Sequence, residues 1–180
     1  MKTIENIIDG SGFDRMISRL AHEILERNHG TGELVIIGLR TRGEFVARRL
    51  AARLAQIENA AIPLGVLDVT LYRDDLRQHL TQPEVRVTDI PFDISDRHVI
   101  LVDDVLFTGR TIRSALDALI DFGRPRTIQL TVLVDRGHRE LPIRADFTGK
   151  TIPTTRGQEV RVKLLEVDNE DGIDLVSIDE

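Results

Sequence analysis

The chain has 180 residues, of which 41% are hydrophobic and 30% are charged. This length and composition are typical of a single globular domain and exclude a disordered or collagen-like chain. Because the sequence contains no cysteine, it excludes disulfide bonds, thiolate zinc sites and cysteine nucleophiles. No apolar run approaches the roughly 18 residues that a membrane helix needs, so we expect a cytoplasmic protein with no membrane partner.

The formal net charge of −6 is concentrated at the C-terminus. Seven acidic residues and no basic residue lie between Glu166 and Glu180, whereas the other 165 residues carry 24 basic and 23 acidic side chains. The net charge therefore neither supports nor excludes a nucleic-acid partner, because arginines are spread over a nearly neutral body. We expect the acidic tail to be a solvated terminus.

Apolar strands alternate with amphipathic helices, which predicts an α/β fold with a mostly parallel sheet flanked by helices. In chain order we expect helix 11–28, strand 34–37, helix 45–54, strand 64–71, strand 99–102, helix 112–122, strand 128–134 and strand 160–164. The polar stretch 72–88 lacks apolar periodicity and contains Pro83, which is typical of a functional flap. The tail after residue 167 is expected to add an edge strand or to fray.

The segment between strand 99–102 and the next helix carries the clearest chemistry. Asp103 and Asp104 end the strand, and a turn containing Gly109 then opens the helix, where backbone N–H groups and the helix dipole favour an anion. Hydroxyls of Thr108 and Thr111 can add hydrogen bonds to a phosphate. Two acids beside a phosphate need neutral hydroxyls or a divalent cation, and a ribose 5-phosphate with Mg²⁺ meets both needs.

Neither a Walker nor a dinucleotide-binding glycine pattern is present. Instead, residues 99–111 resemble the phosphoribosyl pyrophosphate (PRPP) signature of the type I phosphoribosyltransferases. Residues 40–43, 70–76 and 134–146 extend the resemblance to the PyrR family, the bifunctional pyrimidine-operon regulators and uracil phosphoribosyltransferases. The resemblance implies one phosphoribosyltransferase domain over 1–180, with a flexible loop at about 72–88 and a small hood at about 135–165.

The resemblance also assigns roles to individual positions. It places PRPP and its phosphate on Val102, Asp103, Asp104, Val105, Leu106, Phe107, Thr108, Gly109, Arg110 and Thr111. It gives the pyrophosphate loop as Arg40, Thr41, Arg42 and Gly43, and the base-binding positions as Val134, Asp135, Arg136 and Val160. The implied catalytic residues are Asp103, Asp104, Arg42 and Arg73. It further implies Mg²⁺, held mainly by pyrophosphate oxygens without a cage of protein ligands.

A basic helix face provides candidates for RNA contact. Arg15, Arg19 and His22 follow one another at i, i+4 and i+7, opposite the apolar stripe of helix 11–28. A charge run of this kind alone is more often a solvated surface. The resemblance instead implies a basic surface for a pyrimidine-operon leader mRNA stem-loop, formed by a homodimer or homotetramer, and it adds His138, Arg139, Arg144 and Lys150.

Three functions stay open on the sequence. The leading hypothesis is a regulator of pyrimidine genes that binds leader mRNA in response to UMP or UTP and also makes UMP from uracil and PRPP. The second keeps the RNA-binding nucleotide sensor and treats catalysis as vestigial. The third is a salvage phosphoribosyltransferase for uracil or another base, with no RNA role.

Overall fold

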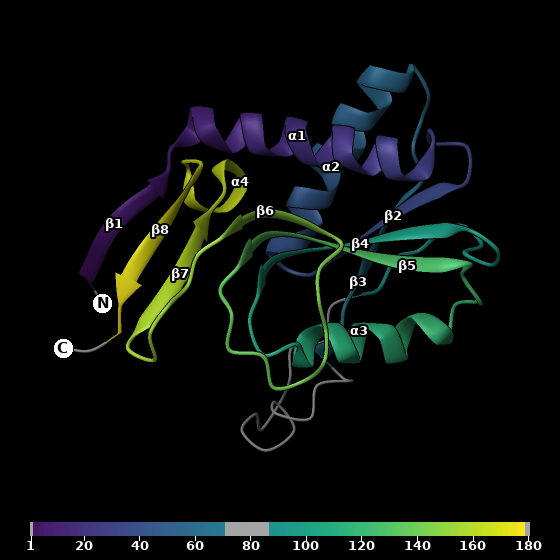
Figure 1. Ribbon diagram of the computed structural model, residues 1–180. Helices are drawn as coiled ribbons and strands as arrows, with labels where there is room; N and C mark the ends of the chain where they lie inside the picture. The colour runs from purple at the N-terminus through teal and green to yellow at the C-terminus, as the bar shows by residue number, and fades with distance from the viewer. Residues whose placement is uncertain (1, 71–86, 179–180) are drawn as a thin grey trace.

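The computed structural model describes residues 2–70 and 87–178, and its centre is a five-stranded parallel sheet (Figure 1). The elements are, in chain order, β1 (Lys2–Ile8), α1 (Gly10–Asn28), β2 (Leu34–Leu39), α2 (Arg42–Glu58), β3 (Leu64–Leu67), β4 (His98–Leu106), α3 (Arg110–Ile120), β5 (Thr127–Asp135), β6 (Phe147–Thr151), β7 (Gln158–Lys163), α4 (Leu165–Asp168) and β8 (Gly172–Ser177). The strand order of the large sheet is β3-β2-β4-β5-β6. This architecture confirms the predicted α/β fold with a mostly parallel central sheet.

Helices cover both faces of the large sheet (Figure 1). Helices α1 and α2 pack on one face, where Phe13 and Leu20 of α1 are fully buried. Helix α3 packs on the other face, against apolar side chains of β2, β4 and β5. All six residues of β2 are buried, as expected of a parallel strand with helices on both sides. The periodic segments of the sequence therefore correspond to the layers of this domain.

The strand predicted over 64–71 is shorter than expected. Strand β3 ends at Leu67, and Oδ1 of Asp68 then accepts hydrogen bonds from the backbone N–H of Thr70 (2.9 Å) and from its hydroxyl (2.6 Å). Such a local side-chain bond competes with strand pairing and turns the chain. Most of the polar stretch 72–88 lies outside the described residues, because residues 71–86 are not among them. The predicted flexible loop therefore stays a prediction.

A second, antiparallel sheet joins the two ends of the chain in the order β1-β8-β7 (Figure 1). The expectation that the tail would form an edge strand or fray is wrong, because β8 is the central strand of this sheet. Ile173 and Val176 of β8 are buried against the core that includes α1 and α2. Burial on one face and pairing along both edges hold this strand in place.

The acidic tail is also not a solvated terminus, because its carboxylates pair with bases elsewhere in the fold. Both Glu166 and Asp171 receive hydrogen bonds from Arg49 of α2. Lys163 of β7 lies 2.8 Å from Glu170 and 2.9 Å from Asp174 through its Nζ atom. The excess negative charge read from the sequence therefore helps to join α4 and β8 to α2 and β7.

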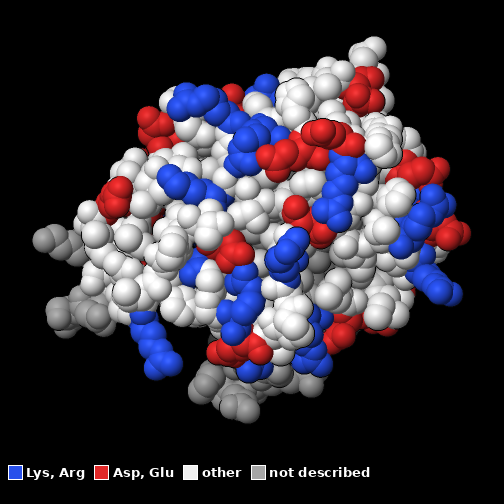
Figure 2. All heavy atoms as spheres, viewed as in Figure 1, with Lys and Arg blue, Asp and Glu red and all other residues white. Residues whose placement is uncertain are grey.

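The surface carries charges of both signs in close alternation. On the face shown in Figure 2, blue and red side chains are interspersed among the described residues, with no broad area of a single sign. Ion pairs within and between helices contribute to this pattern, such as Arg53 of α2 with Asp14 of α1 at 2.8 Å. No helix in residues 2–70 and 87–178 is long and apolar enough to cross a membrane.

Candidate active site

The candidate site lies at the carboxyl edge of the large sheet, where ligands bind in open α/β folds. Residues 40–43, which include the first two residues of α2, follow β2, the loop 107–109 follows β4, and residues 136–140 follow β5. Because the three strands are parallel and adjacent, these segments meet at the same edge. The close approach of Gly43 to strand β4 requires a glycine, since a Cβ on Gly43 would lie 2.6 Å from the carbonyl oxygen of Val102.

The first cavity, of about 350 Å³, surrounds the N-terminus of α3. It is lined by Asp103, residues 105–112 and Glu140. Gly109 has a φ of 92°, a left-handed conformation that favours glycine, and it places the first backbone N–H groups of α3 at the cavity. The positive end of the helix dipole lies in the same place. These features suit a phosphate, as the sequence predicts for this segment.

The two adjacent acids face different cavities. Asp103 lines the phosphate cavity, whereas Asp104 lines a cavity of about 180 Å³ together with Arg42 and strand β7. Successive side chains of a strand point to opposite sides, which explains this division. Each carboxylate is oriented by a backbone N–H, that of Asp104 for Asp103 and that of Val105 for Asp104, both at 2.9 Å.

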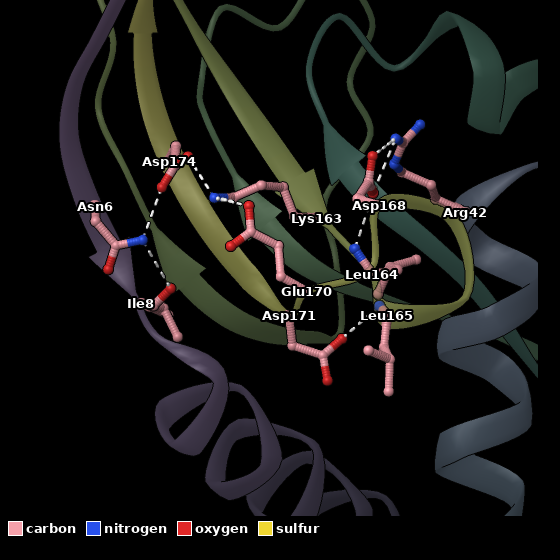
Figure 3. Close-up of polar contacts among 10 residues, drawn as sticks. All are labelled: Asn6, Ile8, Arg42, Lys163, Leu164, Leu165, Asp168, Glu170, Asp171 and Asp174. Carbon is pink, nitrogen blue, oxygen red and sulfur yellow. Dashed lines mark hydrogen bonds and ion pairs between the residues drawn. The ribbon is translucent and has the colours of Figure 1, made fainter.

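The two arginines of residues 40–43, the segment that the resemblance assigns to pyrophosphate, extend in different directions. The Nη2 atom of Arg40 donates to the carbonyl oxygen of Val87 at 2.9 Å. Nε of Arg42 donates to the carbonyl oxygen of Val162 in β7 at 3.0 Å. Its Nη2 atom contacts Asp168 of α4 (Figure 3). Arg73, the fourth implied catalytic residue, lies outside the described residues.

A third cavity, of about 550 Å³, adjoins the phosphate cavity at Phe107 and Glu140, which line both. Arg136 is 8% exposed and donates from Nη2 to the carbonyl oxygen of Gln158 at 2.6 Å. Its guanidinium carbon lies 4.1 Å from the centroid of the Phe107 ring. Burial lowers the pKa of Arg136 from its ordinary value. A buried cation over an aromatic ring thus forms one wall of this cavity.

Two of the four implied base-binding positions line cavities, and the two cavities differ. Arg136 lines the 550 Å³ cavity, whereas Val160 of β7 lines the smaller cavity with Arg42 and Asp104. Val134 is fully buried in β5, and Asp135 receives hydrogen bonds from the N–H of Gly137 and from Arg139. Of the implied base-binding side chains, Arg136 is therefore the one placed beside the phosphate cavity.

Comparison with known proteins agrees with this geometry. The phosphoribosyl transferase domain family matches residues 3–166. The bifunctional protein PyrR of Pelotomaculum thermopropionicum is 56% identical over 93% of this chain and 92% of its own length, and that of Roseiflexus sp. is 58% identical over 97% and 94%. This chain belongs to the PyrR family. A hypoxanthine phosphoribosyltransferase from Staphylococcus aureus shares the fold with a TM-score of 0.71, 20% identity and coverage of 96% and 92%.

Four of the seven RNA-binding candidates of this PyrR chain line two separate cavities. Arg15 and Arg19 line a cavity of about 590 Å³ between β1, α1 and β6, and Arg19 also donates to the carbonyl oxygen of Gly149. His138 and Arg139 line the 550 Å³ cavity instead. His22, Arg144 and Lys150 line neither of these two cavities.

Arg139 of the PyrR chain is extensively bonded within the protein. Its guanidinium donates to the carbonyl oxygens of Ile143 (2.9 Å), Leu106 (3.4 Å) and Phe107, and it pairs with Asp135. It therefore joins the PRPP segment to the end of β5, a contact that the charge pattern of the sequence could not reveal.

Sequence reasoning did not single out several side chains that line the PyrR cavities. Glu140 lines the phosphate and Arg136 cavities, and its carboxylate accepts a hydrogen bond from Nε of Arg110 at 2.6 Å. Arg156 lines the Arg136 cavity, and Glu159 lines the small cavity with Arg42. Glu140 lies inside the matched segment 134–146, so its place after β5 was a usable signal, whereas Arg156 and Glu159 belong to no motif.

Proposed function

We propose that this PyrR chain transfers the ribose 5-phosphate group of PRPP to uracil, and that it also binds pyrimidine-operon leader mRNA in response to UMP or UTP. The junction of two cavities at Phe107 and Glu140 is the observation that supports the transferase most directly. One cavity offers the N-terminus of α3 to a phosphate. The other offers Nη1 of Arg136 to a base, because Nε and Nη2 of this residue already donate to Thr154 and Gln158. A nucleotide that spans the junction has both partners.

The chemistry requires charge stabilisation on both sides of the ribose. The bond from C1 to the pyrophosphate oxygen breaks, and that oxygen keeps the electron pair. A bond forms between C1 and a ring nitrogen of uracil, which loses its proton. Asp103 and Asp104 stabilise the positive charge that develops near C1, and Arg40 and Arg42 stabilise the negative charge on the leaving pyrophosphate.

The acid pair fits Mg²⁺, because hard cations take carboxylate oxygens as ligands. Within the described ranges, no group of three or more histidine or acidic side chains is placed to hold a metal. Asp103 or Asp104 would therefore hold Mg²⁺ together with oxygens of PRPP. When bound, Mg²⁺ neutralises charge on the pyrophosphate.

The RNA-binding role is supported by the basic side chains of α1 and of the segment after β5. Arg139 links the two activities physically, because it bonds to carbonyl oxygens of Leu106 and Phe107 in the PRPP segment and lies beside His138. A nucleotide shifts RNA affinity only by binding the RNA-competent state differently. A homodimer or homotetramer would place two such basic surfaces on one RNA.

The transferase is tested by incubating the protein with uracil, PRPP and Mg²⁺ and measuring UMP and pyrophosphate. We expect UMP formation, and a loss of roughly a hundredfold or more in kcat for Asp103→Asn and Asp104→Asn. Asp117→Asn, which changes an exposed acid of α3, is the matched control. Nucleotide formation from another base but not from uracil would contradict the proposed substrate, and no transfer to any base would leave a nucleotide sensor.

The RNA role is tested by titrating the protein with a stem-loop from a pyrimidine-operon leader, with and without UMP, at two salt concentrations. We expect salt-dependent binding that UMP strengthens and that Arg19→Ala and Arg139→Ala weaken. UMP synthesis without specific RNA binding would instead support the salvage enzyme. Measuring UMP synthesis by the same two variants separates a loss of RNA contact from damage to the active site.

A further inference from the structure

The guanidinium of Arg42 makes two contacts with the C-terminal part of the chain, and Figure 3 shows the one with Asp168. Its Nη2 atom lies 3.0 Å from Oδ1 and 3.1 Å from Oδ2 of Asp168, and its Nε atom donates to the carbonyl oxygen of Val162 at 3.0 Å. The side chains of Arg42 and Asp168 are 31% and 24% exposed. Two of the three guanidinium nitrogens are thus bound by protein atoms.

The carboxylate of Asp168 is also oriented by a hydrogen bond from the backbone. Its Oδ2 atom accepts the backbone N–H of Leu164 at 2.9 Å, at the start of the short helix α4 (Figure 3). The helix places the carboxylate at its C-terminal end, facing the loop that follows β2. A carboxylate that already accepts a backbone hydrogen bond has little freedom to move, so it orients the guanidinium bound to it.

The third nitrogen of Arg42, Nη1, has no hydrogen bond within residues 2–70 and 87–178. Arg42 lines the 180 Å³ cavity that it shares with Asp104. A guanidinium held by Nε and Nη2 keeps its Nη1 donors for an anion without losing side-chain freedom on binding. Arg42 also belongs to the loop proposed to bind pyrophosphate.

We propose that Asp168 is a positioning residue for phosphoribosyl transfer, which holds Arg42 so that Nη1 bonds to the leaving pyrophosphate. The inference rests on the proposed transferase function. Asp168 acts through Arg42 and touches no substrate itself. In this way the acidic C-terminal segment, far from the PRPP motif in sequence, contributes to the pyrophosphate site.

The alternative is that the pair only joins α4 to α2. The fold contains a matched pair of that kind, because Arg49 lies two helical turns after Arg42 and bonds to Glu166 of α4 at 3.0 Å and 2.5 Å. Arg49 is bound by both Glu166 and Asp171, and it lines none of the cavities of the site. Glu166→Gln therefore removes the same charge from α4 without affecting Arg42.

The test compares Asp168→Asn with Glu166→Gln. Magnesium pyrophosphate is titrated into each protein by calorimetry, and its inhibition constant is measured in the forward reaction. We expect Asp168→Asn to weaken pyrophosphate about tenfold and to lower kcat by a similar factor, with KM for uracil changed less than twofold. Glu166→Gln is expected to leave all three values within twofold. Equal losses in the two variants would overturn the proposal.

A double-mutant cycle with Arg42→Ala separates positioning from general stability. Because Asp168 acts through Arg42, Asp168→Asn should cause no further loss in the Arg42→Ala background. A further tenfold loss there would refute positioning. If Asp168→Asn does not fold, Arg42→Lys is measured instead, because lysine keeps the positive charge but lacks the forked set of guanidinium donors. Unchanged pyrophosphate binding by Arg42→Lys would also refute the proposal.

The calorimetric titration separates this proposal from the transferase function. If the wild-type protein makes no UMP but binds pyrophosphate, and Asp168→Asn weakens that binding, the transferase proposal fails and the positioning of Arg42 stands. If UMP forms normally in both proteins with equal pyrophosphate affinity, the positioning proposal alone fails.

Discussion

Replacement of Arg49 by methionine should measure how strongly the acidic C-terminal segment is held to α2. Arg49 bonds to Glu166 at 3.0 and 2.5 Å and to Asp171 at 2.8 Å, and its guanidinium lies 5.3 Å from the centroid of the Phe13 ring. Methionine keeps the apolar stem that packs on the helix but removes all of the donors. The decrease in unfolding free energy therefore measures the contribution of the polar and cation–π contacts of Arg49.

The expected destabilisation is about 2 kcal/mol at pH 7. Each ion pair contributes roughly 0.5 kcal/mol, because the Glu166 side chain is 36% exposed and solvent screens it. The cation–π contact adds roughly 0.5 kcal/mol. Asp171 is 23% exposed and would be left partly buried without its cation, which costs roughly another 0.5 to 1 kcal/mol. The measurement is the urea unfolding free energy of the two proteins.

The difference should depend on pH in a defined direction. The hydrogen bond from Arg49 lowers the pKa of Glu166, while for Asp171 burial raises the pKa but hydrogen bonds from Arg49 and Leu165 outweigh it. Carboxylates with lowered pKa stabilise the fold above their unfolded values of about 4, and this stabilisation is lost as the pH falls through their folded values. We therefore expect the difference to be full at pH 7 and to shrink below about pH 4. A difference under about 0.5 kcal/mol, or one independent of pH, would refute this account.

Three further substitutions test the packing and the site. Gly43→Ala places a Cβ against the backbone of β4. We therefore expect the unfolding free energy in urea to fall by about 1 to 3 kcal/mol and the affinity for pyrophosphate to decrease. Gly149→Ala places a Cβ 2.3 Å from Sδ of Met16, and a fall in melting temperature of several degrees should follow. Arg136→Met removes a buried cation beside Phe107, so KM for uracil should rise about tenfold while the unfolding free energy changes by less than about 1 kcal/mol. A large loss of stability with normal KM would contradict the last prediction.

The parts of the fold that the sequence predicts are those in which one segment carries its own signal. Helix α1 has a regular apolar stripe, and β4 is a continuous apolar run followed by the acid pair. The start of α3 could be placed from Gly109 and the neighbouring threonines, because their effects on the backbone are local. The phosphate cavity therefore corresponds closely to the segment that the sequence identifies.

The elements that the sequence does not predict depend on partners distant in the chain. Strand β1 pairs with β8, which lies at the opposite end of the chain, so neither carries a complete signal alone. Edge strand β6 contains Gly149, a poor strand former that is required because α1 crosses closely above it. Pairing and close packing of this kind appear only when the whole chain is folded.

The same limit applies to charged residues of the site. The acidic tail contains no base, so its sequence indicates a solvated segment, yet its partners lie on α2 and β7. Asp168 contacts Arg42 from 126 residues away, and only the fold shows that this carboxylate faces the segment proposed to bind pyrophosphate. Arg139 is the converse case, because its charge favours an RNA contact while the fold shows all three of its guanidinium nitrogens bonded to protein oxygens. Those of Leu106 and Phe107 belong to the PRPP segment. Arg42 and Arg49 are each bound through Nε and Nη2, so their different expected roles follow from where each side chain lies. Arg42 lines the cavity that it shares with Asp104, whereas Arg49 lines none of the cavities of the site.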